Sequence, residues 1–299
     1  MKKLILSNPL SPGDILIMTG TIRDLALSYP GEYLIDVRSP CPEIFLNNPY
    51  LTPIADKDPE AQLINMEYPL INHSGYTGLH FSDGHRLFLQ ETLRRKIQKT
   101  SMRPTIFLDQ NEINWVNQVK IEYDYDGPFW IVNAGIKGDY TLKQYAYYQE
   151  VIDLLKDKVK FVQVGHTSHN HKPLNNVFDM RGKTNLRQLF RLSYQAEGAL
   201  CAVSLQMVIM QAFKKPCVVI NGGREGMRWQ AINDHVFLHT IGQLPCCLED
   251  GCWRSKFEDC DNKVDNVPRC MWMIKPEIVA YAIENYYVGG RLKNEKQNI

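Results

Sequence analysis

Short apolar runs alternate along the chain with longer segments whose apolar residues recur every three or four positions. The short runs are typical of buried strands, and the longer amphipathic segments are typical of helices that pack on a sheet. Because a strand, a helix and a second strand follow one another at the start, the pattern predicts a βαβ unit and a parallel sheet. In the first part of the chain we expect strands at 4–6, 33–38, 64–67 and 105–108, and helices at 14–26, 44–46, 85–99 and 110–115.

A polar, turn-rich stretch at residues 120–128 interrupts this alternation, and we place an interdomain linker there. Beyond it the alternation returns. The pattern predicts two doubly wound α/β domains that face a central cleft, with residues 1–124 in the first and 125–299 in the second. In the second we expect strands at 129–133, 159–164, 198–203 and 217–220, and helices at 143–155, 185–196, 205–213 and 276–287.

Asp14 stands at the turn between the first predicted strand and the first predicted helix. In open α/β sheets, ligands bind outside the carboxyl ends of the strands, which is where this turn lies. A carboxylate at a helix start is commonly a cap that accepts hydrogen bonds from the first amides. The alternative is a general base held at a cleft. Position alone favours the cap over the base.

The bulk composition is that of an ordinary globular protein and excludes several classes. The 299 residues carry a formal net charge of +1, which offers no global electrostatic attraction to nucleic acid or to a membrane. No apolar run approaches the ~18 residues of a membrane helix. The opening residues 1–6 are basic and then apolar, as at the start of a signal peptide, but Asn8 and Pro9 end the apolar run. We therefore assign these residues to the first strand. Eight cysteines without a signal peptide indicate a reducing compartment, and we expect a cytoplasmic protein.

Five of the eight cysteines fall in one loop-rich segment, residues 245–271. Such a segment buries little core, so a metal ion held by four thiolates would stabilise it. Zinc suits a closed four-thiolate site, and the ligand type alone also admits iron. The alternative is a set of free or disulfide-linked cysteines. Since four ligands suffice and the segment has five cysteines, either Cys246 or Cys247 is not a ligand. The expected metal ligands are Cys247, Cys252, Cys260 and Cys270.

Four motifs carry a specific resemblance. Gly13-Asp14-Ile15 follows the first strand, with a long helix behind it. Further along stand Val132-Asn-Ala-Gly135 with Lys137, Arg181-Gly-Lys-Thr-Asn-Leu-Arg-Gln-Leu189, and Lys215-Pro-Cys-Val-Val-Ile-Asn-Gly222. In their order along the chain and in their residues, these motifs resemble those of glycosyltransferase family 9, the bacterial heptosyltransferases. The cysteine cluster and the stretch at 72–81 resemble most closely the autotransporter-heptosyltransferase-like branch, in which the cysteine motif carries iron.

The resemblance implies the GT-B fold, in which two Rossmann-like domains bring a nucleotide-sugar donor and an acceptor together in the cleft. It implies an inverting transfer of a sugar, typically heptose from ADP-heptose, so an ADP-sugar donor is favoured. Asp14 matches the general base of the family, which reverses the preference for a helix cap. Lys137 matches the basic residue that neutralises the donor diphosphate, and Gly135 would let backbone N–H groups approach that diphosphate. No Mg²⁺ is obligatory in this mechanism.

Further candidate residues lie near the ends of later strands and in the stretch at 72–81. His80 is either a residue that binds the acceptor or a structural histidine. Where the family often has Asp-Ser-Gly-Pro-Met-His, this chain has Val203-Ser-Leu-Gln-Met-Val208, so a different nucleotide sugar and a non-catalytic, metal-stapled nucleotide-binding scaffold both stay open. The residues expected to bind the nucleotide sugar are Gly13, Gly135, Ser204, Gly222, Gly223, Arg224 and Glu225.

No motif in the chain specifies the acceptor. A glycan such as a lipopolysaccharide core sugar, a protein side chain and a hydroxymethylated base of phage-type DNA all offer the required hydroxyl group. The near-neutral charge argues mildly against DNA. A homo-oligomer is also left open.

Overall fold

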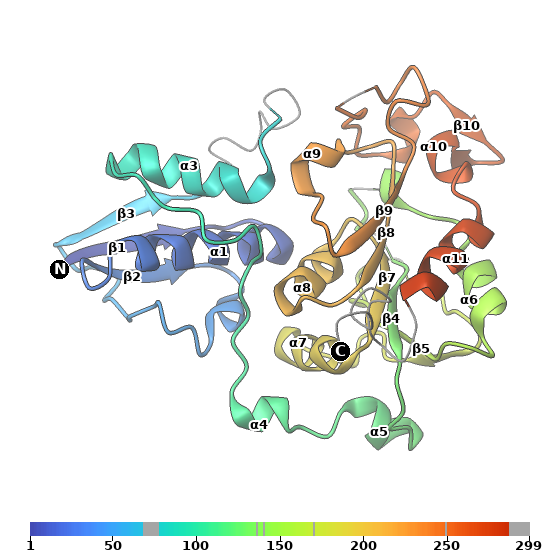
Figure 1. Ribbon diagram of the computed structural model, residues 1–299, viewed down its shortest axis with the longest axis horizontal. Coiled ribbons are helices and arrows are strands. Elements are labelled where there is room, and N and C mark those ends of the chain that lie inside the picture. The colour runs from blue at the N-terminus through green and yellow to red at the C-terminus, as the bar shows by residue number, and fades with distance from the viewer. Residues whose placement is uncertain (68–77, 136, 140, 170, 249, 287–299) are drawn as a thin grey trace, which may run out of the picture.

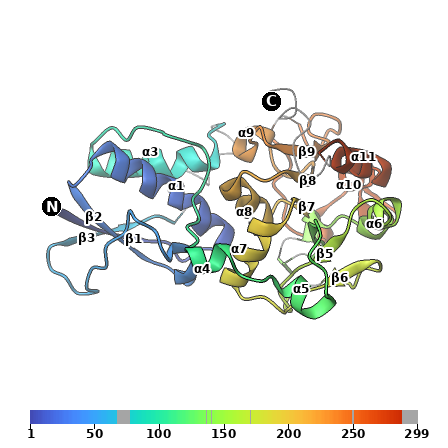
Figure 2. The ribbon, with the colours of Figure 1, turned by 60° about the horizontal axis from the view of Figure 1, so that its bottom comes forward.

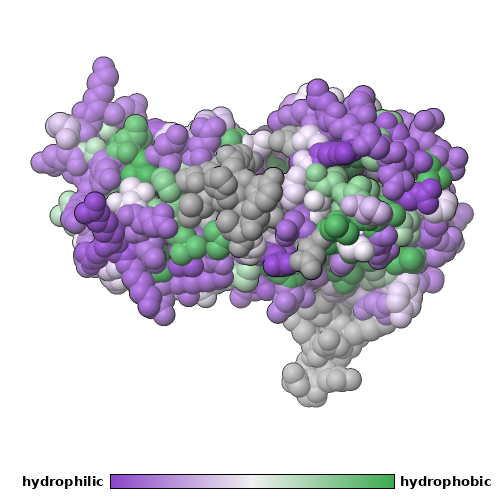
Figure 3. Space-filling view, turned by 90° about the horizontal axis from the view of Figure 1, so that it is seen from above, coloured by the Kyte–Doolittle hydropathy of each residue, from purple (hydrophilic) through white to green (hydrophobic). Residues whose placement is uncertain are grey.

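Two parallel sheets, each with its own helices, make up the fold (Figure 1). The computed structural model describes residues 1–67, 78–135, 137–139, 141–169, 171–248 and 250–286. Viewed from above, two lobes with largely hydrophilic outer surfaces lie side by side (Figure 3). No helix among these residues is long and apolar enough to cross a membrane.

The N-terminal lobe contains a sheet of three parallel strands in the order β2-β1-β3. Its strands are β1 (Lys2–Ser7), β2 (Tyr33–Arg38) and β3 (Ala61–Asn65). The helical elements of this lobe are α1 (Pro12–Ser28), η1 (Pro42–Phe45) and α3 (Phe81–Leu93). Apolar residues of all three strands, α1 and α3 form one buried cluster. Burial of this shared apolar surface holds the helices on the sheet.

The C-terminal lobe contains a sheet of six parallel strands in the order β6-β5-β4-β7-β8-β9. The strands are β4 (Trp130–Asn133), β5 (Phe161–Gln163), β6 (Val177–Asp179), β7 (Gly198–Ala202), β8 (Cys217–Gly222) and β9 (His235–His239). β4, β7 and β8 lie inside the sheet and are almost wholly buried, as expected where helices cover both faces.

Helices and short turns surround the larger sheet (Figure 1). They are η3 (Thr141–Lys143), α6 (Tyr148–Leu155), α7 (Leu186–Gln195), α8 (Leu205–Phe213), α9 (Met227–Gln230), η4 (Phe257–Asp259), α10 (Arg269–Trp272) and α11 (Pro276–Tyr286). A small antiparallel pair, β10 (Lys263–Val264) and β11 (Val267–Pro268), lies within the cysteine-rich segment.

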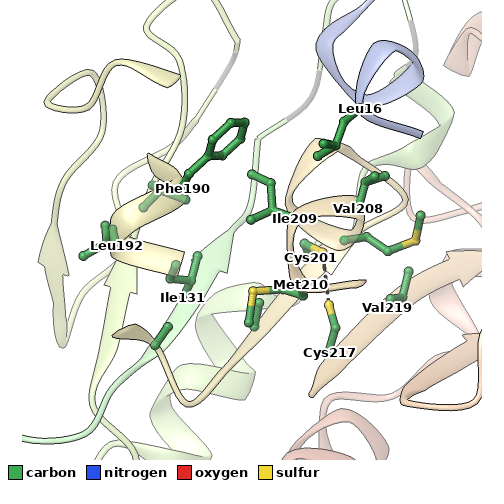
Figure 4. Close-up of a cluster of buried hydrophobic side chains, with 14 of the residues drawn as sticks. Leu16, Ile131, Phe190, Leu192, Cys201, Val208, Ile209, Met210, Cys217 and Val219 are labelled. Atoms are coloured by element: carbon green, nitrogen blue, oxygen red, sulfur yellow. Dashed lines mark hydrogen bonds between the residues drawn. The ribbon is translucent and has the colours of Figure 1, made fainter. Parts of the chain in front are cut away.

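Helix α1 belongs to both lobes. Ile15, Leu16 and Ile17 in its first half lie in the same buried cluster as Val208 and Ile209 of α8. Leu16 points toward α8 in the close-up (Figure 4). The helix is apolar around most of its circumference, and such helices are buried on more than one side. The start of α1 is therefore fixed against the C-terminal lobe.

The connection between the lobes differs from the predicted one. The strand expected at 105–108 is wrong, because this segment pairs with no strand among the residues that the structure describes. Ile106 and Leu108 instead pack against the apolar cluster beside the larger sheet. Two short helices follow, α4 (Gln110–Ile113) and α5 (Gln118–Tyr123), and both lie along the C-terminal lobe (Figure 2). The domain boundary at 124/125 stays a prediction.

Several other boundaries also differ from the sequence pattern. The helix expected at 85–99 spans Phe81–Leu93, because Arg94 adopts a left-handed conformation with φ of 51° and ends it. The helix expected at 143–155 is divided into η3 and α6. β6 and β9 were not predicted: β6 has only three residues, and histidines stand at both ends of β9.

Candidate functional site

The candidate site is built around the turn between β7 and α8, residues 203–205. β7 is an interior strand, so its carboxyl end lies at the middle of the larger sheet. A Cβ atom added to Gly13 would lie 3.5 Å from the Cα of Leu205, which places the start of α1 against this turn. From η3, the Lys143 Nζ donates a hydrogen bond of 3.4 Å to the Val203 carbonyl oxygen. The turn thus brings the Gly13-Asp14 segment and Lys143 to the same end of α8.

Asp14 lies in the first turn of α1 and is half-buried. Ser11, not Asp14, occupies the N-cap position, and its side chain makes no capping hydrogen bond. The Asp14 amide donates to the Ser11 carbonyl oxygen at 3.0 Å. The carboxylate is therefore not required as the helix cap, although a negative charge in the first turn does suit the helix dipole.

Ser204 occupies the N-cap position of α8 with an extended backbone, φ −159°. Its Oγ is buried and has no hydrogen-bond partner in the described part of the chain. A buried hydroxyl without a partner is costly, and the cost disappears when a ligand accepts or donates the hydrogen bond. Ser204 and the first amides of α8 are thus suited to bind an anion.

Glu225 is the centre of a buried ionic network beside this turn. Its Oε1 lies 2.8 Å from the Lys143 Nζ, and it also pairs with Arg224. The Gln230 side-chain amide donates to its other oxygen at 2.8 Å. Burial alone would raise the pKa of Glu225, but the nearby Lys143 and Arg224 cations outweigh it and hold the pKa below its usual range. The carboxylate is therefore charged and saturated with partners.

This burial changes the roles expected for Arg224 and Glu225. Glu225 is only 1% exposed and Arg224 only 7%. The Arg224 Nε donates to the Arg254 carbonyl oxygen at 2.7 Å. Both residues are held inside the protein as an anchor. The Lys143 side chain keeps 21% of its surface exposed. Lys143 is therefore the partly exposed cation of this network. The sequence pattern did not identify it as a site residue.

Lys137 and Gly135, the two residues expected at the donor diphosphate, have other neighbours. Lys137 pairs with Asp139 at 3.3 Å, and half of its side chain is exposed. A Cβ on Gly135 would lie 2.2 Å from the His171 ring, and one on Gly165 would lie 2.1 Å from the same ring. Both glycines therefore make room for this imidazole. The Nδ1 of His171 is buried without a partner among the described residues.

Gly222 and Gly223 make room for the cysteine-rich segment. Gly222 has φ of +61°, and its added Cβ would lie 2.8 Å from the Met271 sulfur. The corresponding atom on Gly223 would lie 2.7 Å from the Cys247 Sγ. A side chain at either position would push the segment away from β8, so both glycines are explained by close packing.

All five cysteines of the segment line one small cavity of about 20 Å³ that also touches Leu142 and Gly223. These residues are Cys246, Cys247, Cys252, Cys260 and Cys270. Burial raises the pKa of Cys270 to about 11 and also raises the pKa of Cys247 and Cys252. Sulfur ligands gathered around one cavity fit the chemistry of zinc or iron. As they stand, no three His, Cys, Asp or Glu residues in the described ranges are arranged to hold a metal ion.

His80 begins α3, where the N-terminal lobe meets α9. Its Nδ1 accepts a hydrogen bond from the Ser82 amide at 3.3 Å, so the side chain caps the helix. Burial lowers the pKa of His80 to about 4, which keeps the ring neutral. The next residue, Phe81, stacks on Trp229 with ring centroids 4.7 Å apart. The structural role expected as one alternative is thus seen, and acceptor binding stays a prediction. The loop expected at 72–81 lies outside the described residues from 72 to 77.

Comparison with known proteins places this geometry in a known fold. No family model matches the chain, and no curated protein sequence matches it. A glycosyltransferase of family 9 from Veillonella parvula superposes with a TM-score of 0.68 at 13% identity, covering 95% of this chain and 96% of that one. The ADP-heptose lipopolysaccharide heptosyltransferase II of E. coli superposes with a TM-score of 0.62 at 15% identity, covering 99% and 100%.

A third similar structure is the iron-containing dodecameric glycosyltransferase TibC from enterotoxigenic E. coli. It has a TM-score of 0.68 at 15% identity, and the match covers 95% of this chain and 75% of TibC. At these identities the likeness establishes architecture. The chain has the GT-B fold of the family 9 glycosyltransferases, as its motifs predicted.

Proposed function

We propose that this protein is an inverting glycosyltransferase that transfers a sugar from a nucleotide-sugar donor, with an ADP-sugar favoured, to a hydroxyl group. The observation that carries the proposal is that Gly13, which directly precedes Asp14, and Lys143 both approach the turn at the start of α8, where α1 of the N-terminal lobe packs on the C-terminal lobe. The fold supports it, because the similar E. coli enzyme is an ADP-heptose heptosyltransferase and another E. coli heptosyltransferase, WaaC, was solved with ADP.

The two residues divide the chemistry between them. Asp14 removes the proton from the acceptor hydroxyl as that oxygen attacks the sugar carbon. The nucleoside diphosphate leaves with growing negative charge. Lys143, the Ser204 hydroxyl and the first amides of α8 stabilise this charge. Because these donors are supplied by the protein, we expect no obligatory Mg²⁺.

Lys137 keeps the role that its motif suggests as a second, outer cation for the donor. Gly13 lies at the contact between the start of α1 and the start of α8, and we place the neighbouring Asp14 close to the leaving group. The sugar could be heptose or another sugar. The acceptor could be a glycan, a protein side chain or a modified DNA base.

The cysteine-rich segment is proposed to hold zinc or iron through Cys247, Cys252, Cys260 and Cys270. The metal would be structural and would take no part in sugar transfer. The likeness to TibC supports iron, since that glycosyltransferase contains iron. TibC is also dodecameric, which supports a homo-oligomer here.

The proposed function is tested by the binding of ADP, UDP, GDP and CDP, with and without their sugars, measured by thermal shift. A ligand at 100 times its Kd adds about 2.7 kcal/mol of stability. We expect one nucleotide, ADP, to raise the melting temperature of the wild type and to do so less in Lys143→Ala. Exposed Lys158→Ala is the matched control, because that lysine pairs with Glu284 at the surface. If none of the nucleotides binds, a metal-stapled scaffold without turnover replaces the transferase as the better explanation.

A further inference from the structure

Residues 252–257, called the strap below, lie between the ionic network and the cysteine cavity. Cys252 begins the strap and lines the cavity. η4 continues from its end to Cys260, which lines the same cavity. The strap is therefore attached to the cysteine cluster at both of its ends.

On one side the strap is bonded to the loop that carries Arg224. The Cys252 amide donates to the Gly223 carbonyl oxygen at 3.1 Å, and the Trp253 amide donates to the Arg224 carbonyl oxygen at 3.0 Å. The Arg224 guanidinium returns a hydrogen bond of 2.7 Å to the Arg254 carbonyl oxygen. The first bond joins the strap to Gly223, and the other two join it to Arg224, the residue that shares Glu225 with Lys143.

On the other side the strap is bonded to η3, which carries Lys143. The Leu142 amide donates to the Ser255 carbonyl oxygen at 3.1 Å. The Phe257 amide donates to the Thr141 Oγ1 at 2.7 Å. Thr141 and Leu142 directly precede Lys143, so the strap fixes the backbone from which the lysine extends.

The backbone of the strap is shaped for this close approach. Gly251, just before it, has φ of +81°, and a Cβ there would lie 2.4 Å from the Arg224 carbonyl oxygen. Trp253 has a positive φ of 53°, which is unfavourable for a bulky residue. Such conformations persist where the surroundings impose them. The strap is held in place by its contacts and not by its own preference.

We propose that residues 252–257 position Lys143 in the donor site, and that the cysteine cluster at the ends of the strap sets that position. The consequence for donor binding rests on the proposed function. Loss of the cluster, by metal removal or by modification of its thiols, releases the strap and moves the lysine. Donor affinity then falls, whereas Asp14, which lies on the other lobe, keeps its place. The cysteine cluster is thus a control point for binding of the nucleotide sugar.

The test uses Thr141→Val, which removes the acceptor for the Phe257 amide and leaves every cysteine intact. Thr105→Val is the matched control, because the Thr105 hydroxyl has no hydrogen-bond partner in the described structure. The first readout is the rate at which acetic anhydride acetylates Lys143 in the full-length protein, measured by mass spectrometry relative to exposed Lys158. A neutral hydrogen bond shifts an equilibrium by about fivefold, so we expect acetylation to rise by about that factor in Thr141→Val and not in Thr105→Val.

A second pair of variants tests the cysteine cluster itself. Cys260→Ser is compared with Cys41→Ser, whose cysteine lies outside the cluster. We expect only Cys260→Ser to increase Lys143 acetylation. Amide hydrogen exchange at Leu142 and Phe257 separates release of the strap from global unfolding, because only these amides and their neighbours should exchange faster.

The second readout is the Kd for ADP and, where turnover is seen, the KM for the donor against kcat. We expect Thr141→Val and Cys260→Ser to weaken ADP binding and raise KM, with little change in kcat. If Lys143 acetylation is unchanged in both variants, the strap proposal is wrong, whatever the activity of the protein. If acetylation rises but nucleotide binding does not change, the strap is supported and the donor role of Lys143 in the proposed function is overturned.

Discussion

The Glu225 carboxylate holds the Lys143 ammonium at 2.8 Å, with 2% of the glutamate side chain and 21% of the lysine side chain exposed. Desolvation of a buried carboxylate offsets much of the attraction in such a pair, so its main effect is on position. The same lysine contacts the Val203 carbonyl oxygen at the start of α8. One positive charge is therefore fixed at the turn that Gly13 contacts from the other lobe.

Asp14→Asn should abolish sugar transfer and leave donor binding nearly intact. Asparagine keeps the size of the side chain but cannot accept the proton, and loss of a general base typically lowers kcat by about 10²–10⁴-fold. The measurements are kcat with the donor found in the nucleotide screen, and the Kd for ADP. Activity equal to that of the wild type would show that Asp14 is not the base.

Lys143→Ala should raise the Kd for ADP more than Lys137→Ala does. Lys143 is fixed at the start of α8, while half of the Lys137 side chain is exposed beside Asp139. A charge-assisted hydrogen bond is worth about 1.5–3 kcal/mol, or a factor of roughly ten to a hundred in Kd. Isothermal titration calorimetry measures both variants. A larger loss in Lys137→Ala would support the assignment made from the sequence motif over the one made from the structure.

His85→Leu should make stability less sensitive to acid. His85 is fully buried on α3, and neither ring nitrogen has a partner in the described part of the chain. Burial lowers its pKa from 6.5 to about 4. As the pH falls, the unfolded chain therefore takes up a proton on this histidine before the folded protein does. The free energy of unfolding decreases by up to about 3 kcal/mol between pH 6.5 and about pH 4.

Urea denaturation of the wild type and His85→Leu at about pH 7 and about pH 5 measures this difference. We expect the leucine variant to be as stable as the wild type near neutrality and more stable in acid, because leucine has no proton to gain. Equal losses in the two proteins would show that another group causes the acid sensitivity. His80, His171 and His235 also have lowered pKa values, so both proteins will retain some loss.

Cys247→Ser should reduce the metal content of the purified protein, and Cys246→Ser should not. Cys247 is 1% exposed and packs against Gly223, whereas Cys246 is exposed. A buried thiol at the wall of the cavity is the better ligand of this adjacent pair. Elemental analysis by mass spectrometry gives the metal and its amount. Metal loss in Cys246→Ser but not in Cys247→Ser would make Cys246 the ligand in place of Cys247. Absence of metal from the wild-type protein would refute the four-thiolate site.

Gly223→Ala should destabilise the protein by about 1–3 kcal/mol, because its methyl group would meet the Cys247 Sγ at 2.7 Å. Gly138→Ala is the control, since no atom in the described part of the chain lies within 4 Å of the added one. We expect that control to change stability by less than about 0.5 kcal/mol. Thermal and urea unfolding measure both. Equal effects would mean that the cysteine-rich segment is not packed on β8 as described.

The sequence determined the architecture of this protein. The period of apolar residues located β1, α1, β2 and the strands β4, β5, β7 and β8 of the larger sheet, because buried strands and amphipathic helices leave local patterns. The two outer strands of that sheet, β6 and β9, left no such pattern. The Gly13-Asp14 motif also located the beginning of α1 to within two residues, since a strand, a break and a helix are all local features, although the helix begins at Pro12 and not at Asp14. The resemblance of the motifs to glycosyltransferase family 9 then led to the GT-B fold.

Only the tertiary structure decided which residues share the site. Lys143 is joined to Glu225, Val203 and the strap by contacts between distant parts of the chain, and no local spacing encodes them. The burial of Arg224 and Glu225 depends in the same way on the segment that covers them. The sequence could identify five clustered cysteines, but their attachment to the lysine follows from hydrogen bonds that form only when the cysteine-rich segment packs on β8 and η3.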